Sequence, residues 1–285
     1  MIGLLFGVTL VLFLDYLDNT IRTPEDIEQY LGLGVLAIVP RIRGGGSVPA
    51  REAYQSLRTS ILFSSHNRER RVLLLTSAGA QEGKSSTTAA LARTLAASGE
   101  RVALLDCDLR RPTQHIHMGV PRDPGISNYI FEGADGDYAR YFAATDIPTL
   151  KVLPCGAIPP SPPELIGNQK FRNLIQSLKA EFDWVLIDSP PIASLTDTIV
   201  LASLVDMVAF VVKHNENDRD LIRRCLKQLR DVHANLIGAV LNDVDFSRSA
   251  NKDYYYAGYD YTRGDEAEKG TKKSRRKPSD RKIAL

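Results

Sequence analysis

Short apolar runs alternate with amphipathic segments along most of this chain. Each run is rich in branched and aliphatic residues and is too short for a typical core helix, which is the pattern of a strand buried on both faces. Such strands are predicted at residues 33–39, 72–75, 102–106, 150–154, 184–188, 207–212 and 236–241. Segments with helical spacing of apolar residues separate most of them. The alternation predicts an α/β fold with a doubly wound, mostly parallel sheet flanked by helices.

Capping residues and glycines mark the expected ends of the helices. Thr23 precedes Pro24 at a first helical position, and Asp26 stands where a capping box needs an acidic side chain. Gly32 is placed to end that helix. Further helices are predicted at residues 52–65, 84–97, 218–232 and in one stretch that begins at Ser161 or Pro163 and runs through Leu178.

The stretch that follows the strand at residues 72–75 predicts a phosphate-binding loop between a strand and a helix. Gly83 lets the backbone approach a phosphate, Lys84 can reach the β- and γ-phosphates, and the Ser85 hydroxyl can bind Mg²⁺. The predicted nucleotide-binding residues of the loop are Gly79, Ala80, Gln81, Glu82, Gly83, Lys84, Ser85 and Ser86. The usual pattern opens with glycine where this chain has Ala78, so the alternative is a small-residue turn with an exposed lysine.

Acidic residues stand at the ends of two of the predicted strands. Asp106 ends one strand with Asp108 just after it, and Asp188 ends another. Because parallel strands deliver their carboxyl ends to one edge of the sheet, these acids are expected beside the phosphate loop. Ser85, Asp106 and Asp188 are the candidate Mg²⁺ ligands. A P-loop NTPase-like fold follows from this combination.

Two histidines follow the acidic residues closely but do not predict a metal site. His115 and His117 are two positions apart, and no further ligand group stands near them in the sequence. A surface position is therefore expected for both.

The three cysteines are scattered, which indicates a reducing compartment without a disulfide framework. The net charge of +2 argues against a nucleic-acid partner, and the 44% apolar content is enough for a sizeable core.

The two ends of the chain differ in character from its middle. Residues 1–14 are uncharged and apolar but too short to span a bilayer, so they are interpreted as the last part of a transmembrane helix, with a buried N-terminal element as the alternative. Arginines after this segment place that side in the cytoplasm if it spans. Residues 264–285 are polar and basic and are predicted to be disordered. A tyrosine cluster precedes them: Tyr254, Tyr255, Tyr256, Tyr259 and Tyr261.

Together these motifs resemble the bacterial tyrosine kinases of polysaccharide co-polymerases. AQEGKSS is similar to the Walker A motif of that family, VALLDCDLRRP to its Walker A′ motif and VLIDSPP to its Walker B motif. The resemblance implies an enzyme that uses ATP and Mg²⁺, with Lys84, Asp106, Asp108 and Asp188 in catalysis. Asp106 is the first candidate to accept the tyrosine proton and Asp108 the second. The five tail tyrosines would be autophosphorylation sites, and Asn242 would contact adenine or, alternatively, cap a turn.

The resemblance also implies a location and a set of partners. It places the chain at the cytoplasmic face of the bacterial inner membrane, in capsule or exopolysaccharide synthesis and export, as a ring-like homo-oligomer that phosphorylates itself in trans. The partners would be a membrane co-polymerase or activator segment, a cognate tyrosine phosphatase and polysaccharide-pathway enzymes. The ring-forming Glu-x-x-Arg-x-x-Arg pattern of the family is Glu52, Gln55 and Arg58 here, and glutamine cannot replace the bidentate contact of arginine.

The expected domain organisation follows from these segments. A partial transmembrane segment (1–14), a juxtamembrane or activator segment with linker (15–50), a kinase domain (51–246), a tyrosine-rich tail (247–263) and a basic tail (264–285) are predicted. Two other functions stay open: a MinD/ParA-like membrane-associated ATPase and an export scaffold that binds ATP without transferring phosphate. The first of these usually has an additional lysine early in the phosphate loop, and residues 77–82 contain none.

Overall fold

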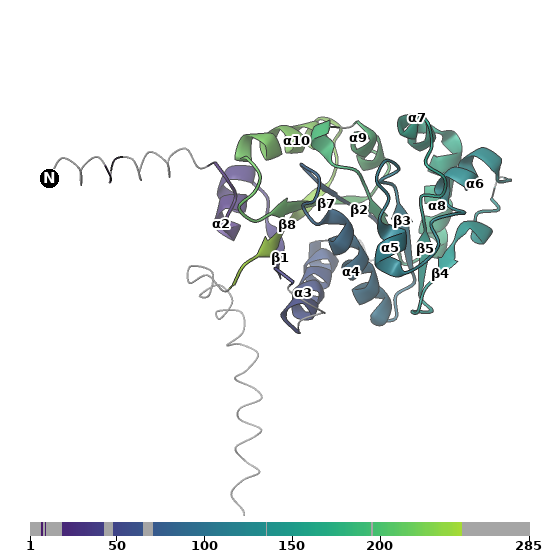
Figure 1. The fold of residues 1–285 in the computed structure, drawn as a ribbon, viewed down its shortest axis with the longest axis horizontal. Helices are drawn as coiled ribbons and strands as arrows, with labels where there is room; N and C mark the ends of the chain where they lie inside the picture. Colours follow the sequence, from purple (N-terminus) through teal and green to yellow (C-terminus); the bar gives the residue numbers. More distant parts are fainter. Residues whose placement is uncertain are drawn as a thin grey trace, which may run out of the picture. The chain divides into compact units, whose positions relative to one another are not determined.

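A computed structural model describes residues 19–42, 48–64, 71–134, 136–194 and 196–246, with positions 7 and 9 alone before them. Eight strands within these ranges form one sheet in the order β1-β8-β7-β2-β6-β3-β5-β4 (Figure 1). All neighbouring strands are parallel except β4 and β5. This confirms the predicted fold class. The predictions for the rest of residues 1–14, for the tail tyrosines and for residues 264–285 lie outside the described residues.

The seven predicted strands are all observed, whereas β4 and the helices α5, α6, η2, η3 and α9 are not among the predicted elements. The strands are β1 (Val35–Pro40), β2 (Arg71–Ser77), β3 (Val102–Asp106), β4 (Ala143–Ala144), β5 (Leu150–Leu153), β6 (Trp184–Asp188), β7 (Met207–Lys213) and β8 (Leu236–Val244). The helices are α2 (Pro24–Asp26), η1 (Ile27–Leu31), α3 (Val48–Ser64), α4 (Lys84–Ala97), α5 (Gln114–Met118), α6 (Ile126–Glu132), η2 (Ala139–Tyr141), α7 (Pro162–Gly167), α8 (Gln169–Glu181), η3 (Ile192–Ser194), α9 (Asp197–Ala202) and α10 (Arg219–Asp231). Among the described residues, no helix is long and apolar enough to cross a membrane.

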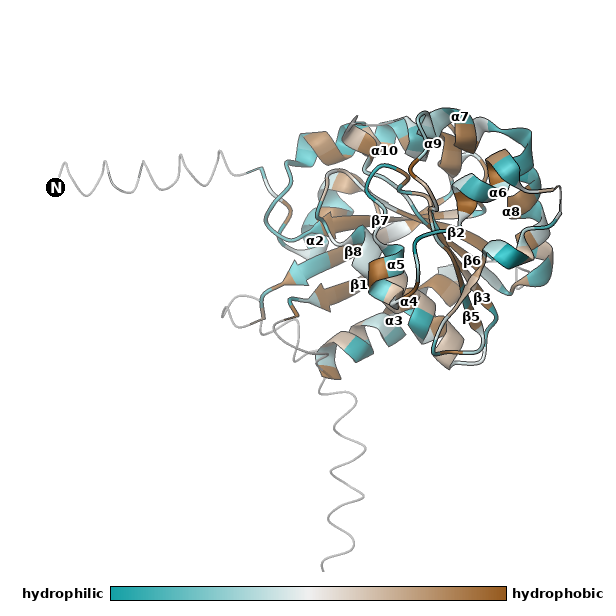
Figure 2. Ribbon diagram, turned by 45° about the vertical axis from the view of Figure 1, so that its right-hand side comes forward, coloured by the Kyte–Doolittle hydropathy of each residue, from teal (hydrophilic) through white to brown (hydrophobic). Residues whose placement is uncertain are grey.

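Helices cover both faces of the sheet. In Figure 1, α3, α4 and α5 lie below the strands, and α7, α9 and α10 lie above them. Figure 2 shows apolar residues along the strands and on the sheet-facing sides of the helices. The core between α3, α4 and the sheet includes Leu57, Leu91 and Trp184, each no more than 1% exposed. The order of layers is that of a doubly wound sheet.

The central strands are buried along their whole length, as continuous apolar runs require. Every residue of β3 and of β6 is buried. The two strands pair in parallel, and their register sets Asp106 opposite Asp188. The two acids that end these strands are therefore held side by side by the backbone, at the carboxyl edge of the sheet.

The predicted first helix begins and ends where its capping residues indicate. The Thr23 side chain accepts a hydrogen bond from Asp26 N, and Asp26 accepts from Thr23 N to complete the capping box. Gly32 follows η1 in the left-handed conformation with φ of +63°. The strand after it, β1, pairs with β8 as an edge strand of the sheet, so part of segment 15–50 belongs to the sheet itself.

The structure corrects the prediction of one continuous helix from Ser161 or Pro163 through Leu178. The chain leaves helical geometry at Asn168, with φ of −68° and ψ of 141°, and the segment divides into α7 and α8. The Asn168 side chain accepts a hydrogen bond from Lys170 N and so caps the second helix. An internal N-cap therefore interrupts a segment whose apolar spacing alone indicated one helix. In addition, α3 begins at Val48, four residues before the predicted start.

Candidate active site

The phosphate loop joins β2 to α4 and has the backbone geometry that the motif predicts. Gly83 is the N-cap of α4 and has a φ of +89°, a conformation that favours glycine. A Cβ atom at Gly83 would lie 2.0 Å from Asn242 Nδ2, so the position also lacks space for a side chain. Asn242 Nδ2 donates a hydrogen bond to Glu82 O at 2.9 Å. The end of β8 therefore holds the loop at its glycine.

The buried side chain of Glu82 hydrogen-bonds to the backbone of the first half of the loop. Its side chain is 1% exposed, and its Oε1 accepts a hydrogen bond from Gly79 N. Burial raises the pKa of Glu82 to about 7, against the lowering effects of the Gly79 N–H and the neighbouring Asn217 amide. The Ala78 that replaces the usual first glycine is fully buried and is not among the residues of positive φ. The local geometry therefore does not require glycine at that position.

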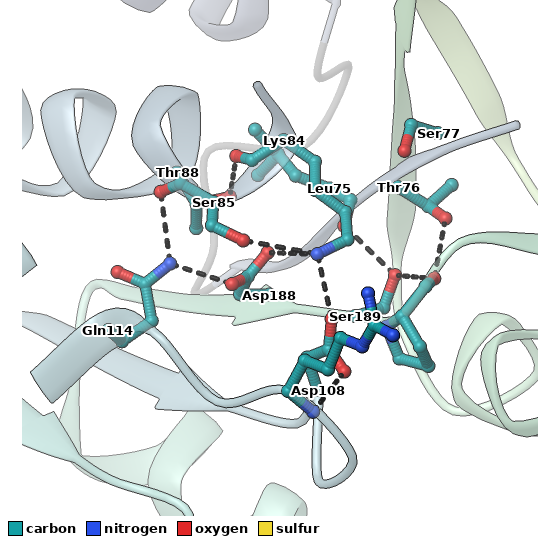
Figure 3. Close-up of polar contacts among 12 residues, drawn as sticks. Leu75, Thr76, Ser77, Lys84, Ser85, Thr88, Asp108, Gln114, Asp188 and Ser189 are labelled. Atoms are coloured by element: carbon teal, nitrogen blue, oxygen red, sulfur yellow. Dashed lines mark hydrogen bonds and ion pairs between the residues drawn. The ribbon is translucent and has the colours of Figure 1, made fainter. Parts of the chain in front are cut away.

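Lys84 lies at the centre of a cluster of polar groups from three elements (Figure 3). Its Nζ lies 2.9 Å from Asp108 Oδ2, 3.9 Å from Asp188 Oδ1 and 3.1 Å from Ser85 Oγ. Burial lowers the pKa of Lys84, but Asp188 and Asp108 outweigh this effect and the net direction is upward. The ammonium group therefore stays charged at the point where the loop would hold phosphates.

The two strand-end acids are buried and close to each other. Asp106 and Asp188 are both 0% exposed. Burial, and then the neighbouring Asp188, raises the pKa of Asp106 well above its usual range. Burial also raises the pKa of Asp188, although Lys84 acts in the opposite direction. A carboxylate in this environment is a stronger base than an exposed one, because removal from water disfavours its charged form.

Gln114 joins these acids to the phosphate loop. Its Nε2 donates to Asp188 Oδ2 at 2.8 Å and to Ser85 O at 3.0 Å, and its backbone N donates to Asp106 Oδ2 at 2.8 Å. The residue is fully buried at the start of α5. The sequence reasoning missed Gln114, although it stands inside the polar segment that follows the acids, which was the only available signal.

The structure brings most of the predicted site residues together. Lys84, Ser85, Asp106, Asp108 and Asp188 meet at the carboxyl edge of the sheet. In the loop itself, Gly79, Gly83 and Ser85 are half-buried, Glu82 and Lys84 are buried, and Ala80, Gln81 and Ser86 are exposed. The Asn242 side chain donates to a backbone carbonyl of the loop. The predicted contact with adenine stays a prediction, and the tyrosines lie outside the described residues.

The donor set fits a magnesium ion that is bound together with phosphate. Asp106 Oδ1 and Asp188 Oδ1 are buried and, within the described part of the chain, have no hydrogen-bond partner. Mg²⁺ prefers oxygen ligands, and in phosphoryl-transfer sites the protein usually supplies only one or two carboxylates, with phosphate and water oxygens as further ligands. Groups of three or more His, Cys, Asp or Glu side chains that could hold a metal on their own do not occur among the described residues. His115 is half-buried and His117 exposed.

Comparison with known families agrees with this geometry. Residues 73–257 match the model of the CobQ/CobB/MinD/ParA nucleotide-binding domain. The tyrosine-protein kinase CpsD of Streptococcus agalactiae is 32% identical over 205 residues, which cover 71% of this chain and 87% of CpsD. The kinase domain of the Escherichia coli tyrosine kinase ETK is 26% identical with a TM-score of 0.73, over 80% of this chain and 97% of that domain.

A longer relative extends well beyond the matched region. The tyrosine-protein kinase Wzc of Salmonella typhi is 29% identical over 243 residues, which cover 85% of this chain. This chain spans 33% of the length of Wzc. Similarity to this relative is therefore similarity to about a third of its length.

Proposed function

The chain belongs to the CobQ/CobB/MinD/ParA nucleotide-binding family and, within it, to the bacterial tyrosine-protein kinases, and on this premise we propose that it transfers the γ-phosphoryl group of ATP to tyrosine. The observation that carries the proposal is the meeting of Lys84 with Asp108 and Asp188 beside the phosphate loop. Phosphoryl transfer depends mainly on positioning and on neutralising charge, which is what this arrangement provides.

The chain's own groups divide the work of holding the nucleotide. The backbone amides at the start of α4 attract phosphate, because they have no partner within the helix and carry the positive end of its dipole. Lys84 supplies an ammonium group for the β- and γ-phosphates. Ser85, Asp188 and Asp106 would hold Mg²⁺, which would neutralise negative charge on the phosphates when bound. Asn242 holds the loop beside Gly83 through its bond to Glu82 O, and the family resemblance supports a further contact of this residue with adenine.

Asp106 is the group that accepts the tyrosine proton. As the phenol oxygen forms its bond to phosphorus, the bond to the β-phosphate oxygen breaks, ADP leaves and the phenol proton passes to the carboxylate. A carboxylate close to Mg²⁺ assists mainly by orienting the phenol and by accepting its proton late in the transfer. Asp108 is the second candidate, because Lys84 already occupies its Oδ2.

The tail tyrosines are the proposed acceptors of phosphate in a neighbouring copy. Each phosphorylation adds about −1.5 to −2 charges. The resulting repulsion between a phosphorylated tail and an acidic site would release one copy from another. Tyr254, Tyr255, Tyr256, Tyr259 and Tyr261 are the predicted positions.

The cellular role proposed for the chain is the control of capsule or exopolysaccharide export at the inner face of the bacterial membrane. The role comes from the family resemblance of the motifs, as do a ring of copies and a membrane co-polymerase partner. Glu52 and Gln55 lie exposed on α3, and Arg58 is half-buried on the same helix, at the positions of the family's ring-forming pattern. Gln55 in place of arginine weakens that contact.

One experiment separates kinase activity from the other two functions. Purified protein is incubated with ATP and Mg²⁺, and phosphotyrosine and released phosphate are measured together. A kinase gives phosphotyrosine on residues 247–263, and changing all five tail tyrosines to phenylalanine removes that signal. Phosphate release without phosphotyrosine would favour a MinD/ParA-like ATPase, and neither product with intact ATP binding would favour a scaffold. The Lys84→Met variant is the control, and a signal that survives it would contradict the proposed site.

A further inference from the structure

Gln114 contacts the three parts of the site that must keep a fixed relation to one another. Its side-chain amide spans the gap between Ser85 O, at the start of α4, and Asp188 Oδ2, at the end of β6. Its backbone N–H reaches Asp106 Oδ2 at the end of β3. Figure 3 shows the side-chain amide pointing at the phosphate-loop helix and at Asp188. The residue is fully buried, so water does not compete for these bonds.

The hydrogen bonds from Gln114 use the same one of the two oxygens in each carboxylate. Asp106 and Asp188 each give Oδ2 to Gln114. Oδ1 of each is buried and without a hydrogen-bond partner within the described part of the chain, and the Lys84 ammonium lies 3.9 Å from Oδ1 of Asp188. Unsatisfied buried oxygens are costly, so two of them on neighbouring strands call for a cation or a bound water.

We propose that Gln114 is a positioning residue that turns both carboxylates so that one defined oxygen of each remains for the divalent cation. The inference deepens the proposed function and rests on it. By holding Oδ2 of Asp188 and Oδ2 of Asp106, Gln114 sets the orientation of the remaining oxygens without touching the cation. Its bond to Ser85 O links that orientation to the residue whose hydroxyl would be the third ligand.

The role requires an amide of this length. The side-chain NH₂ has two donors, and its two acceptors are a backbone carbonyl and a carboxylate. Leucine has nearly the same shape and no donor, so the backbone bond to Asp106 stays while the bonds to Ser85 and Asp188 are lost. Asparagine keeps the donors but is one methylene shorter, so it cannot bridge both acceptors.

The test measures how much Mg²⁺ is needed for nucleotide binding. A fluorescent ADP analogue is titrated onto the full chain and onto the Gln114→Leu variant, first with a chelator and then over a range of Mg²⁺ concentrations. Loss of a group that orients metal ligands typically lowers metal affinity by about 10- to 100-fold. The half-saturating Mg²⁺ concentration should rise by a factor in that range, while metal-free affinity changes by less than about twofold. Gln228→Leu, an exposed glutamine on α10, is the matched control and should match the parent.

Two results would overturn the inference. One is a folded Gln114→Leu protein with the Mg²⁺ dependence of the parent. The other is an equal loss of binding with and without Mg²⁺, which indicates a purely structural role. If the leucine variant does not fold, Gln114→Asn carries the same test, with thermal stabilisation by ADP and by ADP with Mg²⁺ as the readout. A parent protein whose nucleotide binding is indifferent to Mg²⁺ would instead count against the proposed function.

Discussion

Lys84 Nζ and Asp108 Oδ2 lie 2.9 Å apart, in an ion pair whose side chains are 10% and 7% exposed. The lysine that the motif assigns to phosphate is thus held by an internal carboxylate. A nucleotide has to draw Lys84 away from Asp108, or share it, when its phosphates enter the loop. The pair therefore sets part of the free energy of nucleotide binding.

Removal of this competitor should tighten nucleotide binding. In Asp108→Asn the amide no longer attracts Lys84 as a charge does, so ADP binding without Mg²⁺ should become about fivefold tighter, which corresponds to about 1 kcal/mol. Titration with a fluorescent ADP analogue measures this. Asp183→Asn, which disrupts the exposed pair with Arg101, is the control and should leave affinity unchanged. Weaker binding by Asp108→Asn would show that the carboxylate assists the lysine instead of competing with it.

Loss of the lysine should destabilise the fold in a pH-dependent way. Lys84→Met leaves the buried carboxylates of Asp106 and Asp188 without their cation, which should lower the free energy of unfolding by about 3 kcal/mol at pH 8. Both carboxyl pKa values are already raised, so both groups take up protons readily as the pH falls. Urea unfolding should therefore show a smaller loss at pH 5 than at pH 8. An equal loss at both values would contradict the electrostatic explanation.

Glu82 should make stability fall as the pH rises towards neutrality. The pKa of Glu82 is about 7 in the folded protein and 4.5 ordinarily, so between these values the folded state keeps a proton that the unfolded chain releases. Stability from this group is full below about pH 4.5, declines across the window and is lost above about pH 7. Glu82→Gln should reduce the decline by roughly 1–3 kcal/mol, measured by urea unfolding from pH 5 to pH 8. Glu132→Gln, at an exposed position on α6, should follow the parent curve.

A side chain at Gly83 should disturb the loop through Asn242. In Gly83→Ala the new Cβ would lie 2.0 Å from Asn242 Nδ2 and the residue would keep a φ of +89°. ADP affinity should fall at least about tenfold, because strain of this kind costs about 1–3 kcal/mol. Adding Asn242→Ala removes the close contact but not the backbone strain, so the double variant should recover part of the thermal stability. Full recovery of the thermal stability, or no recovery, would contradict the inference that the Asn242 contact and the backbone strain both contribute to the loss.

Restoring the missing arginine on α3 should favour assembly. Gln55 is exposed, and Gln55→Arg supplies a guanidinium that can pair bidentately with a carboxylate of another copy. Sedimentation at increasing protein concentration should show a higher average mass for the variant than for the parent. Gln228→Arg on α10 adds the same charge elsewhere and should leave the mass distribution unaltered. If both substitutions act equally, net charge and not the α3 pattern explains the effect.

The fold could be predicted where burial alone decides the structure. Buried parallel strands need continuous apolar runs, so β3 and β6 have the expected boundaries, and an acid at the end of each marks the edge of the sheet. The bounds of α7 and α8 could not be predicted in this way. The apolar spacing is helical on both sides of Asn168, and only the observed side-chain cap reveals the break.

The charged residues of the site could be predicted from the sequence, but the role of the uncharged Gln114 and the hydrogen-bond partner of Asn242 could not. Lys84, Asp106 and Asp188 belong to motifs in which residue type and spacing specify the chemistry. Gln114 is a common residue in an ordinary polar segment, and its role depends on distances between strands that a sequence does not contain. The partner of Asn242, likewise, is a backbone carbonyl far away along the chain.

The register of β3 and β6 has a consequence for how such a protein can change over evolutionary time. The backbones of Asp106 and Asp188 are neighbours because two parallel strands align them, and in the chain between the two residues Gln114 contacts both carboxylates. Insertions and deletions in the part of that chain after α5 can therefore accumulate without moving either acid. A single residue added inside either strand would send one carboxylate to the opposite face of the sheet.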